Sequence, residues 1–264
     1  MPARYLVAVV ERRDYGCACE LVFRAPEDFR PHPGQFVHVD CGDGGRILRR
    51  PFSVFDRAEG TASILVREAG AGSSWLRRKG PGERLDLLGP LGRGFDPGEE
   101  GKTLLVAGGA GIAPLHFLAR RLLEEGKPCL VAWGIGKPGE YGELPELLAE
   151  RMELHLACLE DSGRNGGTAV DLAMRLYPEI GGLICACGPR EMLISLASQV
   201  EGTDREGLSR LQVSVEERMA CGVGVCRGCA VPAAKPPGAY LAACSDGPVF
   251  RGDELDWERM AALT

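Results

Sequence analysis

Four cysteines near the C-terminal end of the chain have a spacing that suits metal binding. Cys221, Cys226, Cys229 and Cys244 form the pattern C-x4-C-x2-C, followed by a fourth cysteine after a gap of fourteen residues. This is the spacing of plant-type [2Fe–2S] sites, whereas structural zinc usually takes two short cysteine pairs on separate knuckles. We therefore predict a [2Fe–2S] cluster on these four thiolates, with zinc as the alternative.

The glycines between these cysteines support the same prediction. Gly222, Gly224 and Gly228 would let one loop approach a cluster closely, adopt positive φ angles and point its N–H groups at sulfur. A disulfide framework is not expected, because the N-terminal run YLVAVV is short for a secretion signal and lacks a small-residue cleavage site. Most of the other seven cysteines are expected to be small buried hydrophobes; they are Cys17, Cys19, Cys41, Cys129, Cys158, Cys185 and Cys187.

The composition limits the remaining classes of function. The chain has 264 residues, of which 45% are hydrophobic and 26% charged, and its net charge is −6. An acidic chain of this kind is not expected to bind nucleic acid or an anionic membrane surface. No apolar run approaches the roughly 20 residues of a membrane span. We expect a soluble, cytoplasmic protein with room for two modest domains and a small third one.

Two different structural patterns precede the cysteines. Up to about residue 97, short alternating runs such as QFVHVDC and ASILVRE are separated by Gly and Pro, which predicts a small antiparallel β-barrel. From Thr103 onward the pattern is strand, glycine loop, helix and strand, with Pro114 in the first turn of the helix and Gly126 at its end. Such βαβ units predict a parallel α/β sheet. The expected fold is a multi-domain β plus α/β chain, with a barrel at 1–99, an α/β domain at 100–205 and a small cluster domain at 206–264.

Two segments of the barrel region combine polar residues with glycine or proline. RRPFSVF, residues 49–55, contains Arg50, Phe52 and Ser53, which taken alone could be a surface charge, a core aromatic and a strand hydroxyl. GAGSSWL, residues 70–76, has the composition of a helix N-terminus that can bind phosphate. The two segments together favour a ligand site on the barrel.

Two glycine segments follow strands of the α/β region. In VAGGAGIAPL, residues 106–115, Gly109 and Gly111 fit the first two glycines of a dinucleotide-binding loop, although Pro114 departs from its usual ending. CACGPREML, residues 185–193, places Cys187 and Gly188 at the carboxyl end of a strand, where open α/β sheets bind their ligands. A tight turn without a ligand is the alternative for the first segment.

These motifs, in this order, resemble those of the ferredoxin–NADP reductase superfamily, whose members bind FAD on the barrel and a pyridine nucleotide on the α/β domain. The cysteine loop with CSDGPVF is similar to that of one family, the electron-transfer subunits of the NAD-linked (type B) dihydroorotate dehydrogenases. The resemblance covers essentially the whole chain. It departs at Phe52, where the superfamily more often has Tyr, and in LEDSGRNGGTAVDL, residues 159–172, which matches an Asp-Gly-Ser stretch only loosely.

The resemblance implies roles for individual residues. Arg50 would meet an FAD phosphate, Phe52 would pack on the cofactor, and Ser53 would approach flavin N5. Arg67, Gly72 and Ser73 would lie along the ribityl and pyrophosphate groups. The complete implied set of cofactor-binding residues is Arg50, Pro51, Phe52, Ser53, Leu65, Val66, Arg67, Gly72, Ser73, Gly109, Gly111, Cys187 and Gly188, with Cys187 beside the nicotinamide. No residue is assigned as a catalytic acid or base.

The same resemblance implies an electron relay that uses FAD, a [2Fe–2S] cluster and NAD+. A partner subunit containing FMN would oxidise dihydroorotate for pyrimidine (UMP) biosynthesis, in a heterotetramer with two copies of each chain. The preference for NAD over NADP is taken from the family. Two other functions stay open. One is a reductase that passes electrons from NAD(P)H to an oxygenase or a ferredoxin, and the other is a non-catalytic sensor whose cysteine loop is structural.

Overall fold

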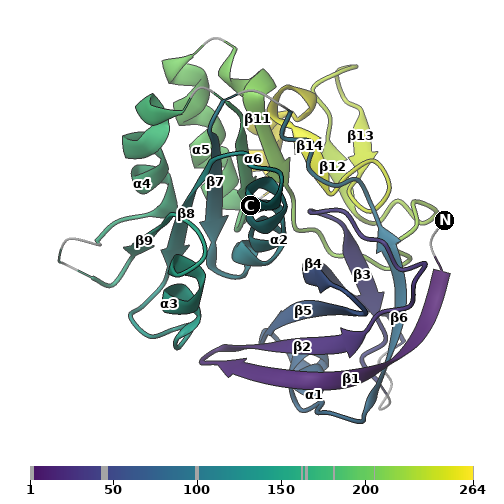
Figure 1. The fold of residues 1–264 in the computed structure, drawn as a ribbon. Helices are drawn as coiled ribbons and strands as arrows, with labels where there is room; N and C mark the ends of the chain where they lie inside the picture. Colours follow the sequence, from purple (N-terminus) through teal and green to yellow (C-terminus); the bar gives the residue numbers. More distant parts are fainter. Residues whose placement is uncertain are drawn as a thin grey trace.

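The N-terminal part of the chain is a closed antiparallel barrel of six strands, as predicted (Figure 1). The computed structural model describes residues 3–42, 47–98, 101–161, 163, 166–180, 182–204 and 206–263. The barrel strands are β1 (Ala3–Tyr15), β2 (Ala18–Arg24), β3 (Phe36–Val39), β4 (Arg50–Ala58), β5 (Thr61–Arg67) and β6 (Arg84–Leu91). Their order around the barrel is β1-β2-β5-β4-β3-β6, and the short helix α1 (Ala71–Arg77) follows β5.

Alternation of apolar side chains explains why these segments close into a barrel. In β6 every second residue is buried, including Leu85 and Leu87. Successive side chains of a strand point to opposite faces, so one face fills the interior and the other meets solvent. Leu21 and Phe23 from β2 and Ile64 from β5 complete the interior and are fully buried.

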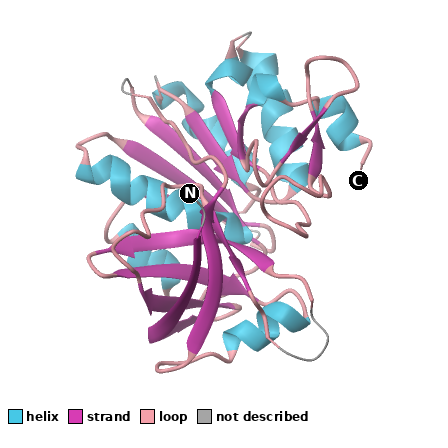
Figure 2. Ribbon diagram, turned by 90° about the vertical axis from the view of Figure 1, so that its right-hand side faces the viewer, coloured by secondary structure: helices cyan, strands magenta, loops and turns pink. Residues whose placement is uncertain are grey.

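The second part is a six-stranded sheet with the order β14-β11-β10-β7-β8-β9. Its parallel strands are β7 (Thr103–Gly108), β8 (Cys129–Ile135), β9 (Leu154–Cys158), β10 (Ile184–Cys187) and β11 (Leu211–Ser214), and β14 (Val249–Arg251) runs antiparallel to β11. Its helices are α2 (Ile112–Glu124), α3 (Leu144–Ala149), α4 (Ala169–Leu176) and α5 (Arg190–Thr203). Helices α2 and α3 cover one face and α4 and α5 the other, so the strands are buried on both sides (Figure 2).

The C-terminal part is built onto the edge of this sheet. It contains the two-stranded sheet β12 (Ala230–Pro232) and β13 (Tyr240–Ala242) and the helix α6 (Trp257–Ala261). Two strands that follow residue 205, β11 and β14, belong to the α/β sheet, so the sheet extends past the boundary predicted there. Cys229 and Cys244 share one buried core with Val213 and Phe250 of those strands, which fixes the cysteine loop to the sheet.

Helix α2 joins the barrel to the sheet. Its His116 stacks on Phe55 of β4 with ring centroids 4.4 Å apart, and Arg120 Nε lies 2.7 Å from Asp56 Oδ1. Phe117, one residue along, packs into the core of the barrel. Because all three contacts come from one rigid helix, the barrel and the sheet are held in a defined relative position. No helix of the described ranges is long and apolar enough to cross a bilayer.

Candidate functional site

A cavity of about 740 Å³ lies where the barrel, the α/β sheet and the start of the cysteine loop meet. Residues from all three predicted domains, 1–99, 100–205 and 206–264, line it. Seven of the residues expected to bind cofactor line it, namely Arg50, Pro51, Phe52, Ser53, Leu65, Arg67 and Cys187. A volume of this size is within the range of small-molecule and cofactor sites. One site therefore collects residues that are more than a hundred positions apart in the sequence.

Strand β4 forms the barrel side of this cavity. Pairing of Phe36 with Ser53 and of Val37 with Phe52 fixes its register against β3. The guanidinium of Arg50 donates to the carbonyl oxygen of Leu48 over 2.7 Å, which holds this cation at the rim. The Arg50 side chain also lies beside Gly72 at the start of α1, where an added Cβ would be 3.5 Å from Arg50 Cγ.

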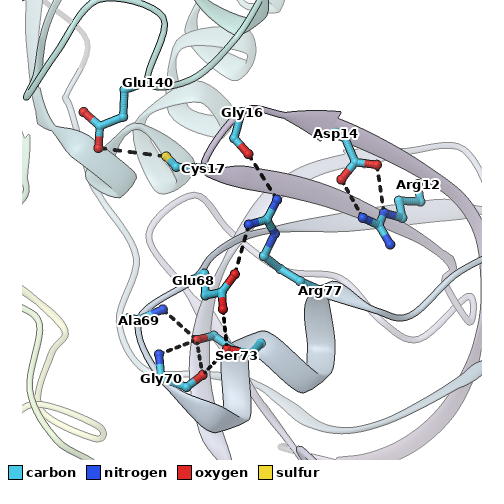
Figure 3. Close-up of polar contacts among 11 residues, drawn as sticks. Arg12, Asp14, Gly16, Cys17, Glu68, Ala69, Gly70, Ser73, Arg77 and Glu140 are labelled. Carbon is cyan, nitrogen blue, oxygen red and sulfur yellow. Dashed lines mark hydrogen bonds and ion pairs between the residues drawn. The ribbon is translucent and has the colours of Figure 1, made fainter.

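Two residues of the predicted set do not point their side chains into the cavity. Val66 lies in the core of the barrel, because it alternates with Leu65 and Arg67, which face the opposite way. The Ser73 hydroxyl is used locally: it accepts from the backbone N–H groups of Ala69 and Gly70 and donates to the Gly70 carbonyl (Figure 3). A cofactor contact at these two positions would therefore use the backbone, and it stays a prediction.

The predicted nucleotide loop packs directly against the end of β10. After β7 the chain makes a short turn over Gly109–Gly111 and enters α2. A Cβ at Gly111 would lie 2.0 Å from the carbonyl oxygen of Cys187, and one at Gly188 would lie 3.0 Å from the backbone of Gly108. Gly109 has a φ of 52°. The glycines therefore permit the two strand ends to touch at the carboxyl edge of the sheet, where ligands of α/β folds bind.

The four predicted ligand cysteines form one loop-bound group with backbone donors around it. The N–H groups of Val223 and Cys226 each lie 3.5 Å from Cys221 Sγ, and that of Gly224 lies 3.1 Å from Cys244 Sγ. Further N–H groups reach Sγ of Cys226 and of Cys229. Positive φ values of 72° at Gly222 and 81° at Gly224 turn these amides inward. Gly228 has no positive φ, and it instead passes close to Cys226 Sγ.

The cysteines are arranged as two pairs, which fits a centre with two irons. The backbone N–H of Cys226 donates to Cys221 Sγ, and that of Cys244 donates to Cys229 Sγ. Donation from the Cys226 and Val223 amides lowers the pKa of Cys221 to about 6, whereas burial raises the pKa of Cys244 to about 12. Within the described ranges, no group of three or more His, Cys, Asp or Glu side chains converges on a single-ion position. The donor set suits [2Fe–2S] binding, which takes thiolates with amide support.

Four consecutive residues that the sequence did not single out also line the cavity. Glu216, Glu217, Arg218 and Met219 lie between the end of β11 and the first cysteine. Desolvation by the cavity walls raises the pKa of the Glu216 carboxyl. Burial likewise raises the pKa of the nearby Cys187 thiol. The charged run EER directly after an apolar strand is the signal that could have found them. Ser162, Arg164 and Asn165 of the LEDSGRNGGTAVDL segment lie outside the described residues.

This combination of barrel, α/β sheet and shared cavity defines a protein with the ferredoxin–NADP reductase fold. The structure resembles one solved in a study of flavin-based electron bifurcation by the NADH-dependent reduced ferredoxin–NADP oxidoreductase, with a TM-score of 0.81, 27% identity, and coverage of 98% of this chain and 92% of that one. It also resembles the FAD/NAD-binding domain of nitric oxide dioxygenase from Vibrio cholerae, with a TM-score of 0.68 and 20% identity over 80% of this chain and 98% of that one, which supports the fold alone.

The cysteine loop and the curated relatives narrow the assignment. Residues 216–256 match the family model described as the iron-sulfur cluster binding domain of dihydroorotate dehydrogenase B. The electron transfer subunit of dihydroorotate dehydrogenase B (NAD(+)) from Geobacillus kaustophilus is 37% identical, with 84% of this chain and 86% of the relative covered. The subunit of the same name from Desulforamulus reducens is 36% identical, with 89% and 91% covered. The chain belongs to the family of electron-transfer subunits of NAD+-dependent dihydroorotate dehydrogenase B.

Proposed function

We propose that this chain carries electrons between a dihydroorotate-oxidising partner subunit and NAD+. The observation that supports this most directly is the continuity of the cavity with the cysteine loop. Residues 214–219 line the cavity, and Cys221, the first cluster ligand, follows two residues later. A cofactor in the cavity and a cluster on the loop would therefore be adjacent, which short-range electron transfer requires.

The barrel side of the cavity is the proposed FAD site. Arg50 and Arg67 would neutralise phosphate charge, and the glycine-rich start of α1 beside Arg50 leaves space for the pyrophosphate. Phe52 and Leu65 would pack on apolar parts of the cofactor. Ser53 provides a hydroxyl at the same wall and would orient the flavin by a hydrogen bond.

The carboxyl edge of the sheet is the proposed NAD site. Gly111 lets the loop pass close to Cys187, and Gly109 supplies the positive φ of the turn, so that a dinucleotide can lie across the strand ends. The buried thiol of Cys187 lines the cavity and is held neutral by its surroundings. It would therefore pack beside the nicotinamide as an uncharged wall and would not act as a nucleophile.

When bound, FAD exchanges a hydride with NAD and single electrons with a [2Fe–2S] cluster, so that two-electron and one-electron chemistry are joined in one chain. The proposed partner is the catalytic dihydroorotate dehydrogenase subunit, with FMN as its flavin, in a heterotetramer of two copies of each chain. No residue of this chain is proposed as the base for dihydroorotate. We expect the complex to work in the cytoplasm, where free thiols persist, and to serve pyrimidine synthesis.

The first experiment is a measurement of cofactors and acceptors. The purified chain should contain one FAD and two irons with two sulfides, and anaerobic NADH should bleach its flavin. Addition of the catalytic subunit should allow dihydroorotate to reduce NAD+. A colourless protein would instead support the sensor, and dihydroorotate oxidation by this chain alone would contradict the proposed division of labour.

A second function is favoured by one finding, the similarity over 98% of the chain to the ferredoxin–NADP oxidoreductase structure. A reductase that serves a free ferredoxin or an oxygenase would use the same cavity and the same cysteine loop. The two functions differ in the acceptor: rapid reduction of a ferredoxin by NADH, without any response to the catalytic dihydroorotate subunit, would favour the second.

A further inference from the structure

His38 is a buried histidine whose ring has no hydrogen-bond partner among the described residues. It lies in β3, is fully buried, and both ring nitrogens are shielded from solvent. A buried polar atom without a partner is destabilising, so such atoms usually have a partner in the functional state of the protein. Because a neutral imidazole always carries one N–H, His38 has a donor that the described residues leave unused.

The His38 ring faces the cysteine loop. Gly222, next to the ligand Cys221, passes directly over the imidazole, and a Cβ built on Gly222 would be 2.6 Å from His38 Nδ1. Gly222 also has a φ of 72°, so a side chain is disfavoured there twice. The loop therefore lies so close to the ring that only glycine fits at position 222.

His38 also lies beside residues that line the cavity. Its strand neighbour Pro51 and the aromatic ring of Phe36, whose centroid is 6.3 Å from that of His38, both line the cavity. The charged groups that act on the ring are Arg49 and Arg50. Burial and these two cations lower the pKa of His38 to about 4. The ring is thus neutral. It lies close both to Gly222 of the cysteine loop and to residues that line the proposed FAD site.

We propose that His38 is a positioning residue of the iron–sulfur centre, whose ring N–H donates a hydrogen bond to a sulfur of the cluster or of its ligands. The inference rests on the proposed [2Fe–2S] cluster. Hydrogen bonds to sulfur stabilise the reduced, more negative form of a cluster and so raise its reduction potential. The same contact holds the cysteine loop against β3, and β3 pairs with β4, the strand that carries the proposed flavin contact Ser53.

The test compares two substitutions in the complete chain with its cofactors. His38→Leu keeps the side-chain size but removes the donor, whereas His38→Asn keeps an N–H close to the Nδ1 position. Redox titration followed by electron paramagnetic resonance (EPR) should show a more negative cluster potential for His38→Leu and a value near that of the unchanged protein for His38→Asn. The flavin potential should stay the same in both. His155→Leu, at a half-exposed histidine on β9, is the control and should change neither potential.

A second measurement starts from the unchanged protein. With ¹⁵N-labelled histidine in the unchanged protein, pulsed EPR of the reduced cluster should detect a coupled histidine nitrogen, and His38→Asn should abolish it. If this coupling is absent, or if a folded His38→Leu protein keeps the cluster potential of the unchanged protein, the inference is wrong and the ring has another partner such as an ordered water. If His38→Leu fails to fold, the labelling result decides. Absence of any cluster would overturn the proposed function together with the inference.

Discussion

The guanidinium of Arg67 lies 3.3 Å from the carboxylate of Glu140, and this contact joins the wall of the cavity to the α/β sheet. The other carboxylate oxygen of Glu140 accepts from the N–H of Gly136 over 2.7 Å, and its carbonyl oxygen accepts from the N–H of Cys17 in the barrel. In Figure 3 the side chain of Glu140 points toward Cys17. A single acidic residue thus places a loop of the sheet against a cation of the proposed FAD site.

We expect Arg67→Gln to weaken FAD binding about tenfold, or about 1.4 kcal/mol, because it removes a cation from the cavity wall. Glu140→Gln should change FAD affinity by less than about threefold, since an ion pair whose cation is half exposed contributes little. FAD titration of the deflavinated protein, followed by flavin fluorescence, measures both. The control is Arg12→Gln, whose partner Asp14 lies on the same barrel strand away from the cavity. Equal losses for Arg12→Gln and Arg67→Gln would contradict a phosphate contact at Arg67.

Gly111→Ala should damage the nucleotide loop. The added Cβ would lie 2.0 Å from the Cys187 carbonyl oxygen, so the strand ends must separate. Overpacking of this kind costs about 1–3 kcal/mol, and we expect weaker NADH binding together with a lower Tm. Gly202→Ala is the matched control, because nothing lies within 4 Å of the site and alanine favours the helix. Unchanged NADH affinity in Gly111→Ala would argue against a dinucleotide at this loop.

The ion pair between Asp56 and Arg120 should make the junction of barrel and sheet sensitive to acid. Burial alone would raise the pKa of Asp56, but the hydrogen bond and charge of His116 and the charge of Arg120 outweigh it and hold the pKa below its ordinary value. A carboxyl with a lowered folded-state pKa stabilises the fold above its ordinary pKa of about 3.9, and this contribution is lost as the pH falls through the folded value.

We therefore expect Asp56→Asn to lower the free energy of unfolding by about 1 kcal/mol at pH 7 and to have a smaller effect at pH values below about 4. Urea unfolding of cluster-free protein is the measurement, because acid protonates the thiolates that hold iron. Asp14→Asn, in an exposed pair with Arg12 on one strand, should have little effect at either pH. A loss for Asp56→Asn that grows as the pH falls would have the wrong sign for this account.

Cys226→Ser should separate the two halves of the electron path. Cys226 is exposed and its Sγ accepts from a backbone amide of the loop. Removal of this thiolate should abolish electron transfer between the partner subunit and FAD. NADH oxidation by an artificial acceptor should stay within about twofold, since Cys226 does not line the cavity. Cys129→Ser, at a cysteine of β8 that does not line the cavity, should leave both activities intact. Loss of both activities in Cys226→Ser would mean that the cluster is mainly structural.

Local patterns were sufficient to predict the barrel, the βαβ units and the cysteine cluster site. Alternation of burial in β6 and the glycines before α2 are properties of a few adjacent residues, so they can be read from the sequence. The pairing of β11 with β14 could not be predicted in this way, because the whole cysteine loop separates the two strands in the sequence. Their pairing depends on a core that Cys229 and Cys244 help to form.

Site residues that stand in a sequence motif could be predicted. Residues that reach the site only because the fold brings distant segments together were missed. Arg50, Ser53 and Cys187 stood in recognisable motifs and line the cavity. Val66 was placed in the cofactor set by the resemblance, and its side chain lies in the barrel core, so a contact there stays a prediction for its backbone. His38 looked like one more residue of an apolar strand, since the loop that passes over it is more than 180 residues away.

Anaerobic mixing with dihydroorotate tests the central claim most directly. The chain in complex with the catalytic subunit is mixed with dihydroorotate in the absence of NAD+, and the EPR signal of the cluster and the absorbance of the flavin are followed over time. The account predicts that cluster and FAD are both reduced in the complex, that neither is reduced in the chain alone, and that added NAD+ reoxidises both. A complex in which dihydroorotate leaves the cluster and FAD of this chain oxidised would contradict it.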